Sequence, residues 1–224
     1  MVKKKKIVFS KIPSWANAFL STKPLIILSN WVLQGMRYMN WRERVYRICT
    51  ELLVVGFLFF AGLSLVVSIV VAHTLFWLLN GHIFVLLRYI VNISFDQKAF
   101  WKYAEQINRR MKKRTYIAAC AAFGSISRDT FSVTSDYDVR IIRKQGLLSS
   151  VRAFNACAYE RLLAFLSGFP IDIYVFDPGD LDEKIDSSEN PVIMCDPQGI
   201  LKKKYGQKAR MFSDILTNIG KGTV

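Results

Sequence analysis

The sequence predicts an α/β (α+β) fold: a small mixed sheet flanked by helices and preceded by an α-helical transmembrane hairpin. Two observations predict it. Apolar runs that are almost free of charge fill residues 52–91, while residues 95–224 alternate short apolar runs with stretches of helical spacing. We therefore expect a basic, amphipathic membrane-surface segment over residues 1–50, a transmembrane hairpin over residues 51–94 and a cytoplasmic domain over residues 95–224.

The composition favours the same division. The chain of 224 residues is 52% hydrophobic although 21% of it is charged, and its mean hydropathy is +0.22. This combination usually means that a membrane part and a water-soluble part are segregated along the chain. A net charge of +14 suits nucleic acid or anionic lipid. Much of it lies beside the apolar runs, so we expect lipid rather than nucleic acid as the partner.

Residues 1–50 begin with the run Lys3–Lys6 and are rich in basic and aromatic residues. No small-residue cleavage site follows a hydrophobic core, so a secretory signal peptide is not expected. Basic, amphipathic segments of this kind tend to lie on an anionic membrane surface. A basic arm without fixed structure is the alternative.

Leu52–Val71 carries no charge and is long enough to cross the ~30 Å hydrocarbon core as a helix. Leu75–Val91 is a weaker second span, because Asn80-Gly81-His82 interrupts it and it contains Arg88. Basic residues flank both runs, which places both ends of a two-span hairpin in the cytoplasm. A single span followed by a re-entrant or interfacial helix is the alternative.

The remaining residues predict one compact domain of alternating helices and strands. Gly168 marks the expected end of the second long helix. The expected elements are a helix over Asp96–Arg114, strands over Tyr116–Phe123 and Asp136–Ile142, a helix over Leu147–Ser167, a strand over Ile171–Phe176 and an edge segment over Pro191–Met194. The four cysteines lack any C-x-x-C spacing and are expected to be reduced thiols.

The candidate site lies where the first predicted strand ends and the second begins. A Gly124-Ser125 turn offers an unobstructed backbone N–H and a hydroxyl, which are groups that hold phosphate oxygens. Asp136 and Asp138 are two positions apart on a strand and therefore share one face. Paired carboxylates suit a hard cation such as Mg²⁺. Asp172, on the third predicted strand, supplies another carboxylate.

This pattern of Gly-Ser, Asp-x-Asp and a later strand carboxylate resembles the nucleotidyltransferase superfamily typified by DNA polymerase beta and its minimal relatives. The resemblance covers roughly Tyr116–Phe176. It implies that Gly124 and Ser125 hold the β/γ-phosphates of a nucleoside triphosphate (NTP). It implies further that Asp136 and Asp138 bind Mg²⁺, with Mn²⁺ as a substitute, and that Asp172 holds a second metal near the acceptor hydroxyl.

Two arginines are candidate nucleotide contacts. Arg128 matches a basic residue often found three positions after the serine, and Arg140 shares a strand face with the two aspartates. Arg143 competes with them for the same role. Tyr137, between the aspartates, and Asp129 depart from the family pattern, which bears on how a nucleotide would fit.

The resemblance and the apolar runs together predict a membrane-anchored, pyrophosphate-releasing nucleotidyltransferase. It would transfer a nucleoside monophosphate from an NTP such as ATP to a hydroxyl of a membrane-associated glycan, lipid or protein by a two-metal mechanism. A second protein chain, or a second copy of this one, is expected to supply the acceptor side. A D-x-D glycosyltransferase and a non-catalytic nucleotide-binding membrane scaffold are the alternatives.

Overall fold

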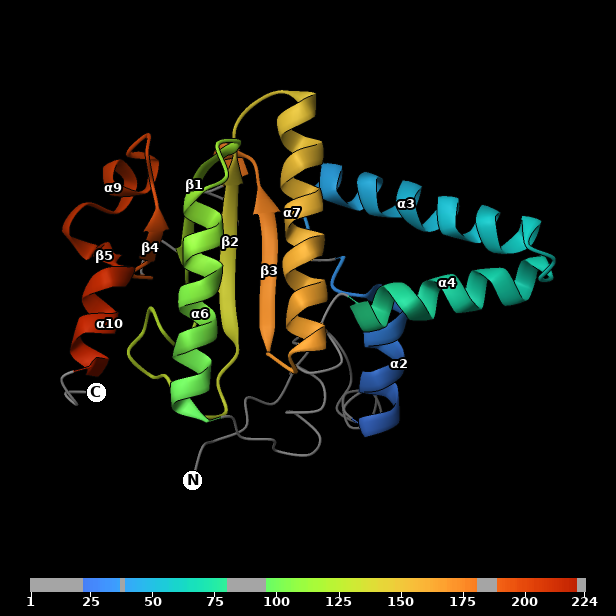
Figure 1. Ribbon diagram of the computed structural model, residues 1–224, viewed down its shortest axis with the longest axis horizontal. Coiled ribbons are helices and arrows are strands. Elements are labelled where there is room, and N and C mark those ends of the chain that lie inside the picture. Colours follow the sequence, from blue (N-terminus) through green and yellow to red (C-terminus); the bar gives the residue numbers. More distant parts are fainter. Residues whose placement is uncertain (1–21, 37–38, 80–95, 181–188, 221–224) are drawn as a thin grey trace, which may run out of the picture.

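A computed structural model describes residues 22–36, 39–79, 96–180 and 189–220 (Figure 1). The predicted α/β domain of a mixed sheet flanked by helices is confirmed. Its elements are α6 (Gln97–Lys112), β1 (Ile117–Ala122), β2 (Tyr137–Arg143), α7 (Leu147–Leu166), β3 (Ile171–Phe176), β4 (Val192–Cys195), α9 (Ile200–Tyr205), β5 (Arg210–Met211) and α10 (Phe212–Gly220). Before them come α2 (Lys23–Leu33), α3 (Trp41–Phe60) and α4 (Leu65–Leu79).

The five strands form one sheet in the order β3-β2-β1-β4-β5. β1 runs antiparallel to both β2 and β4, whereas β2 pairs with β3 in parallel, as does β4 with β5. The segment that was predicted to lie at an edge is β4, which lies between β1 and β5. That prediction was wrong because a short apolar run does not show how many neighbours a strand has.

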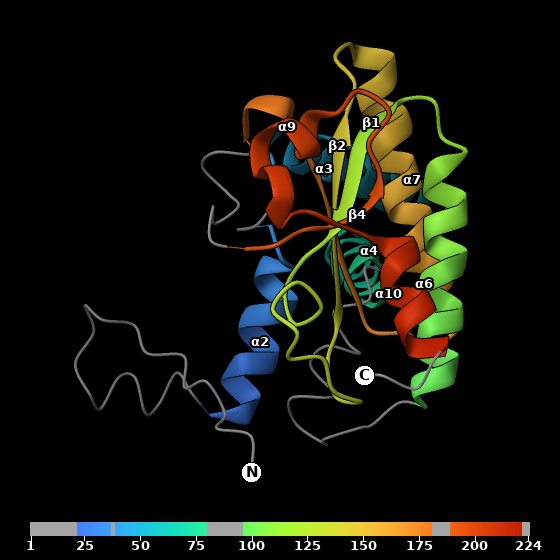
Figure 2. The same cartoon turned by 90° about the vertical axis from the view of Figure 1, so that its left-hand side faces the viewer.

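The two faces of the sheet are covered differently (Figure 2). α6, α7 and α10 lie against one face, and Ile107, Met111 and Phe154 belong to the apolar core on that side. The other face carries α9, with Leu201 and Tyr205 packed on it, and receives Met39 from the segment before α3. The carboxylate face of β2 and β3 is this second face.

The basic end of α6 is anchored inside the domain. Glu160 of α7 is fully buried and accepts hydrogen bonds from Arg110 (2.7 Å) and Arg114 (2.7 Å). The exposed Arg109 pairs with Glu105 one turn earlier. Two of the basic residues in this region therefore fix α6 to α7.

The predicted transmembrane span Leu52–Val71 is not one helix. α3 ends at Phe60 and α4 begins at Leu65, so the chain turns back within the apolar run. Gly62 has a φ of +99° and its N–H donates to the carbonyl of Phe59, which is typical of the glycine that ends a helix. The prediction of one continuous span was wrong because a uniformly apolar run is compatible both with one long helix and with two helices joined by a turn.

Neither helix of this hairpin, nor any other in the described part of the chain, combines the length and apolarity needed to cross a membrane. The predicted transmembrane hairpin is therefore not found there. Most of the second predicted span, Leu75–Val91, lies outside the described residues, as do residues 1–21 of the predicted surface segment.

α3 is joined to the domain at the edge strand β3. Glu43 is buried, and its carboxylate accepts hydrogen bonds from the backbone N–H of Val175 (3.1 Å) and from Arg161 of α7 (3.0 Å). Asn40, which caps α3, also donates to Asp180 beyond β3. Glu43, in the first turn of α3, thus satisfies one backbone donor on the outer side of the edge strand β3.

His73 links the three N-terminal helices. Its Nδ1 lies 2.7 Å from Glu51 of α3, and its Nε2 lies 3.0 Å from the carbonyl of Trp31 in α2. The side chain of Gln34 donates to the carbonyl of His73 at 2.8 Å. The histidine therefore has a structural role in helix packing.

Candidate active site

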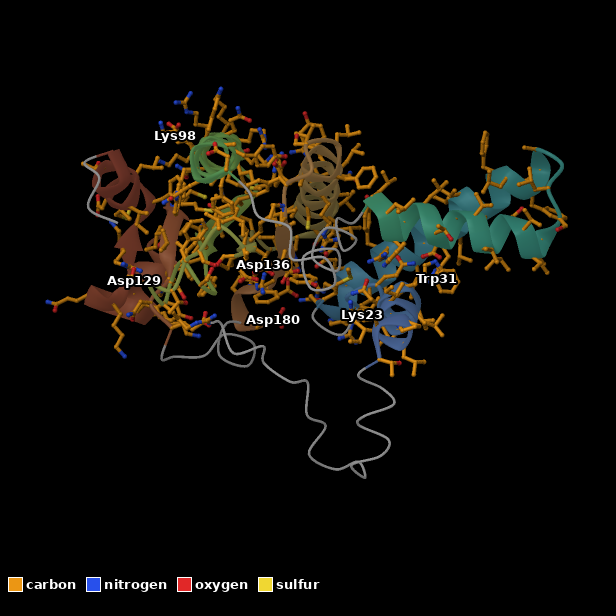
Figure 3. All side chains as sticks on the ribbon, turned by 90° about the horizontal axis from the view of Figure 1, so that it is seen from below. Lys23, Trp31, Lys98, Asp129, Asp136 and Asp180 are labelled. Carbon is orange, nitrogen blue, oxygen red and sulfur yellow. The ribbon has the colours of Figure 1, made fainter. Side chains whose placement is uncertain are left out.

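Asp138 and Asp172 face each other across two neighbouring strands. They are paired in the parallel register of β2 and β3, and both lie near the beginning of their strands. Asp136 immediately precedes β2. Figure 3 is seen from the end of the sheet where these strands begin, and labels Asp136 there. The fold thus brings the three predicted carboxylates to one end of the sheet, although their roles stay predictions.

The Gly124 turn and Asp138 are in close contact. A side-chain carbon placed on Gly124 would lie 1.8 Å from Oδ2 of Asp138, and the φ of Gly124 is +69°. The short contact excludes a residue with a Cβ unless the carboxylate moves, and the positive φ would strain the backbone of such a residue. The glycine therefore allows the backbone of the turn to approach the carboxylate.

Arg140 lies between the two strand carboxylates. Its Nη2 is 3.4 Å from Oδ2 of Asp172 and 3.7 Å from Oδ1 of Asp138, and its Nη1 donates to the backbone carbonyl of Asp172 at 2.9 Å. The guanidinium also lies over the Tyr174 ring at 5.0 Å. Arg140 thus lies on the same face of the sheet as Asp138, as strand alternation predicts. In this structure its guanidinium lies beside the carboxylates of Asp138 and Asp172.

Burial and neighbouring charges both shift the pKa of Asp138. Burial raises the pKa of Asp138 well above its ordinary value, and the carboxylates of Asp136 and Asp172 raise it further, while Arg140 opposes the rise. The side chains of Asp138 and Asp172 are 19% and 24% exposed, so ligand can still reach them. A cation bound beside Asp138 would stabilise the charged form of this carboxylate.

Ser125 is the second residue of the predicted phosphate turn. Its Oγ is buried and has no hydrogen-bond partner within the described ranges. The turn itself is closed by hydrogen bonds from the Arg128 N–H to the Gly124 carbonyl and from the Thr130 N–H to the Ser125 carbonyl. An unsatisfied buried hydroxyl in a rigid turn beside Asp138 is suited to a ligand oxygen.

Arg210 is a residue of this site that the sequence did not reveal. From β5 it donates to the carboxylate of Asp129 (2.7 Å) and to the carbonyls of Ile126 (3.0 Å) and Ser127 (3.3 Å). Asp129 has a φ of +54°, which is unusual for a residue other than glycine. The departure from the family pattern at Asp129 therefore accompanies an ion pair that fixes the loop after the Gly-Ser turn.

The structure also gives the positions of Arg128 and Tyr137. Arg128 lies in the same loop, with its guanidinium 2.8 Å from Glu189 and half exposed. Tyr137 is fully buried on the opposite face of the sheet, where its ring contacts Phe100 and Phe169. Because alternate strand residues point to opposite faces, Tyr137 does not enter the carboxylate site.

The carboxylates have the chemistry of a magnesium site but not a closed cage. Among the described residues, no three His, Cys, Asp or Glu side chains are grouped closely enough to hold an ion. The donor types nevertheless fit, because Asp138 and Asp172 are paired across β2 and β3 beside the turn that carries the unsatisfied Ser125 hydroxyl, and carboxylate and hydroxyl oxygens are ligands that Mg²⁺ prefers. Arg140, at 3.4 Å from Oδ2 of Asp172 and 3.7 Å from Oδ1 of Asp138, would compete with an ion for these oxygens.

Comparison with known proteins agrees with this geometry. No curated protein gave a significant match to the chain. Residues 104–194 match the family model described as "Nucleotidyltransferase domain". The matched region runs from α6 to β4 and contains the Gly-Ser turn and the three carboxylates, so it supports the assignment of this part of the chain to the nucleotidyltransferase superfamily.

Proposed function

We propose that this protein transfers a nucleoside monophosphate from an NTP to an acceptor hydroxyl. In this reaction the acceptor oxygen bonds to the α-phosphorus, the bond from that phosphorus to the β-phosphate oxygen breaks, and pyrophosphate leaves with the electron pair. The observation that carries the proposal is the close approach of the Gly124 turn to Asp138, with Asp172 opposite in register.

Different residues would bind the triphosphate and the acceptor hydroxyl. The backbone of Gly124 and the unsatisfied hydroxyl of Ser125 would hold the β/γ-phosphates. Asp172 would lie on the acceptor side and receive the hydroxyl proton as the new bond forms. Arg210 holds the phosphate turn in position through Asp129 and two backbone carbonyls.

Mg²⁺ is the cofactor we propose, with Mn²⁺ as a substitute. Asp136 and Asp138 would hold the ion beside the triphosphate, and Asp172 would hold a second ion. When bound, the ions supply positive charge that offsets the charge on the attacking and leaving oxygens. The raised pKa of Asp138 is compatible with this role, because burial and the neighbouring carboxylates disfavour its charged form and a bound cation would favour it.

Arg140 supports a second candidate function. Its guanidinium already lies beside Asp138 and Asp172, where the ions would bind, and no ready cation cage is found in the described part of the chain. A chain that kept this arrangement would bind a nucleotide without transferring it. The two candidates differ in whether Arg140 leaves the carboxylates when Mg²⁺ and NTP arrive.

The acceptor and the location are further parts of the proposal. The described hairpin exposes apolar side chains, which favours an acceptor at a membrane, such as a glycan, a polar lipid headgroup or a protein. We propose that a second protein chain, or a second copy of this one, completes the acceptor side, and that the site faces the cytoplasm.

The test is a transfer assay with the purified full chain and with membranes that contain it. Each of the four NTPs, labelled at the α-phosphate, is supplied with Mg²⁺, and sugar-labelled UDP-sugars serve as the comparison. Transfer of α-label that is lost in an Asp138→Asn, Asp172→Asn variant supports the proposal. Saturable NTP binding without transfer supports the binding-only candidate, and transfer from UDP-sugars alone contradicts both.

A further inference from the structure

The hairpin of α3 and α4 has a tip that nothing in the described structure covers. It stands away from the β3 and α7 side of the domain (Figure 1). Phe60 is 88% exposed, Leu53 74% and Phe57 73%, and Val66 of α4 is 71% exposed. Apolar side chains exposed on both helices of one projecting element indicate an interaction surface.

The tip carries no charge and the base carries many. Residues 52–72 contain no acidic, basic or histidine side chain. At the base, Glu43 is buried against Arg161, and Glu51 lies against His73. The exposed charges there are basic: Lys23, Arg42 and Arg44. The exposed charges are therefore confined to the base, where they lie among the exposed apolar side chains of Trp41, Val45 and Ile48 and where Arg42 also lies 3.8 Å from Asp177.

The dimensions match half of a bilayer. At about 1.5 Å per residue, the apolar half of α3, Leu52–Phe60, rises about 13 Å. The facing part of α4, Leu65–Ala72, rises about 12 Å. One leaflet contributes about 15 Å of a hydrocarbon core of ~30 Å. Each arm therefore reaches through most of one leaflet and no further.

Aromatic and helical features mark where the headgroups would lie. The indole N–H of Trp31 donates to Thr74 and that of Trp77 donates to Asn30, which places both rings at the base of the hairpin. α2 lies across this base (Figures 1 and 3) and exposes Leu28 and Leu33. Tryptophans and an apolar helix across the base are typical of the interfacial level of a membrane.

We propose that the α3–α4 hairpin inserts into one leaflet of an anionic phospholipid bilayer and returns to the same side, with α2 at headgroup level. The apolar tip would take the place of lipid chains, and the basic base would contact phosphate groups. This mode of attachment requires no helix to span the membrane. A second copy of the chain would cover an apolar tip but gives no role to the basic base.

The first test is flotation of the full chain with vesicles. The wild type is expected to float with phosphatidylcholine–phosphatidylglycerol vesicles and less with phosphatidylcholine alone. A Phe57→Glu, Phe60→Glu variant is expected to bind at least about tenfold more weakly. Leu147→Glu, Leu148→Glu is the matched control, because both leucines are exposed at the start of α7 (Figure 1), which lies away from the tip of the hairpin. Thermal unfolding should show that both variants stay folded.

The second test measures depth. A spin label is placed at Phe60→Cys, in a Cys49→Ser background, and compared with one at Val45→Cys near the base. The tip label should respond to oxygen and resist a water-soluble nickel complex, while the base label should show the reverse. An impermeant thiol reagent should fail to reach the tip cysteine from either side of the vesicle.

Three results would overturn the proposal. In the first, the tip cysteine reacts with reagent trapped inside the vesicle, which would mean that the hairpin crosses the bilayer. In the second, the wild type does not float but forms dimers that the Phe57→Glu, Phe60→Glu variant dissociates, which would identify a second copy as the partner. In the third, the Leu147→Glu, Leu148→Glu control loses flotation as fully as the tip variant.

Discussion

The carboxylate of Asp138 occupies the space that a side chain at Gly124 would fill. The two are joined at the end of neighbouring strands, since the N–H of Phe123 donates to the carbonyl of Asp138 at 2.9 Å. The phosphate turn and the proposed metal ligand are therefore in direct contact, so a substitution at either residue should displace the other.

The first prediction concerns the glycine. Gly124→Ala should lower transfer activity at least about a hundredfold, because the methyl group displaces the Asp138 carboxylate by more than 1 Å. It should also cost about 1–2 kcal/mol of folding free energy for the left-handed backbone. Gly199→Ala is the matched control: its φ is +68° and nothing lies within 4 Å. Equal loss of activity in the two variants would show that the contact with Asp138 is unimportant.

The second prediction concerns pH. The folded-state pKa of Asp138 is raised by burial and by Asp136 and Asp172, so between the unfolded and folded pKa values the native state binds more protons than the unfolded state. The free energy of unfolding should therefore fall as pH rises through that window.

Asp138→Asn cannot ionise and should avoid this loss. Without added metal, the variant should be more stable than the wild type above the window and similar to it below the ordinary aspartate pKa, although it should lack transfer activity. Chemical denaturation at a series of pH values, in chelator, measures the difference. If Asp138→Asn were less stable than the wild type at neutral pH, the result would contradict a raised pKa of Asp138 in the folded state.

The third prediction concerns Arg210. Arg210→Ala removes the donor to Asp129 and to two carbonyls of the loop after the Gly-Ser turn. The KM for NTP should rise about tenfold and kcat should change less, because the loop positions phosphate and does not react. Lys208→Ala, an exposed neighbour, should leave both constants unchanged. A fall in kcat at constant KM would place Arg210 in the reaction itself.

The fourth prediction concerns the buried Glu160 and its two arginine partners, which hold α6 to α7. Glu160→Gln leaves Arg110 and Arg114 without their shared carboxylate and should lower the free energy of unfolding by about 3 kcal/mol. Glu105→Gln, which breaks the exposed pair with Arg109, should cost less than about 0.5 kcal/mol. Urea denaturation measures the loss of unfolding free energy for each substitution. Similar losses for the two would mean that the ion pairs of Glu160 do not secure the helices.

Local patterns predicted the α/β domain well. Helical spacing placed α6 and α7, and the turn residues Gly124 and Gly168 bounded their neighbouring elements. The face shared by Asp138 and Arg140 followed from strand alternation alone. These features are fixed by residues close in sequence, which a single sequence can display.

Long-range pairing was not predictable in the same way. The register that sets Asp172 beside Asp138 depends on how α7 crosses between β2 and β3. The clamp of Arg210 on Asp129 joins residues far apart, and Glu43 reaches β3 from the N-terminal helices. In the apolar run, Gly62 follows the end of α3, and the hydroxyl of Ser64 accepts a hydrogen bond from the N–H of Val67 at the start of α4. The apolarity of the whole run nevertheless predicted one continuous span.

The most direct measurement of the central claim is the phosphate product released by the purified full chain with Mg²⁺, NTP and acceptor-containing membranes. We predict one pyrophosphate for each nucleotide transferred, and none with Asp138→Asn or Asp172→Asn. Release of orthophosphate instead, or pyrophosphate release that survives both substitutions, would contradict nucleotidyl transfer at these carboxylates.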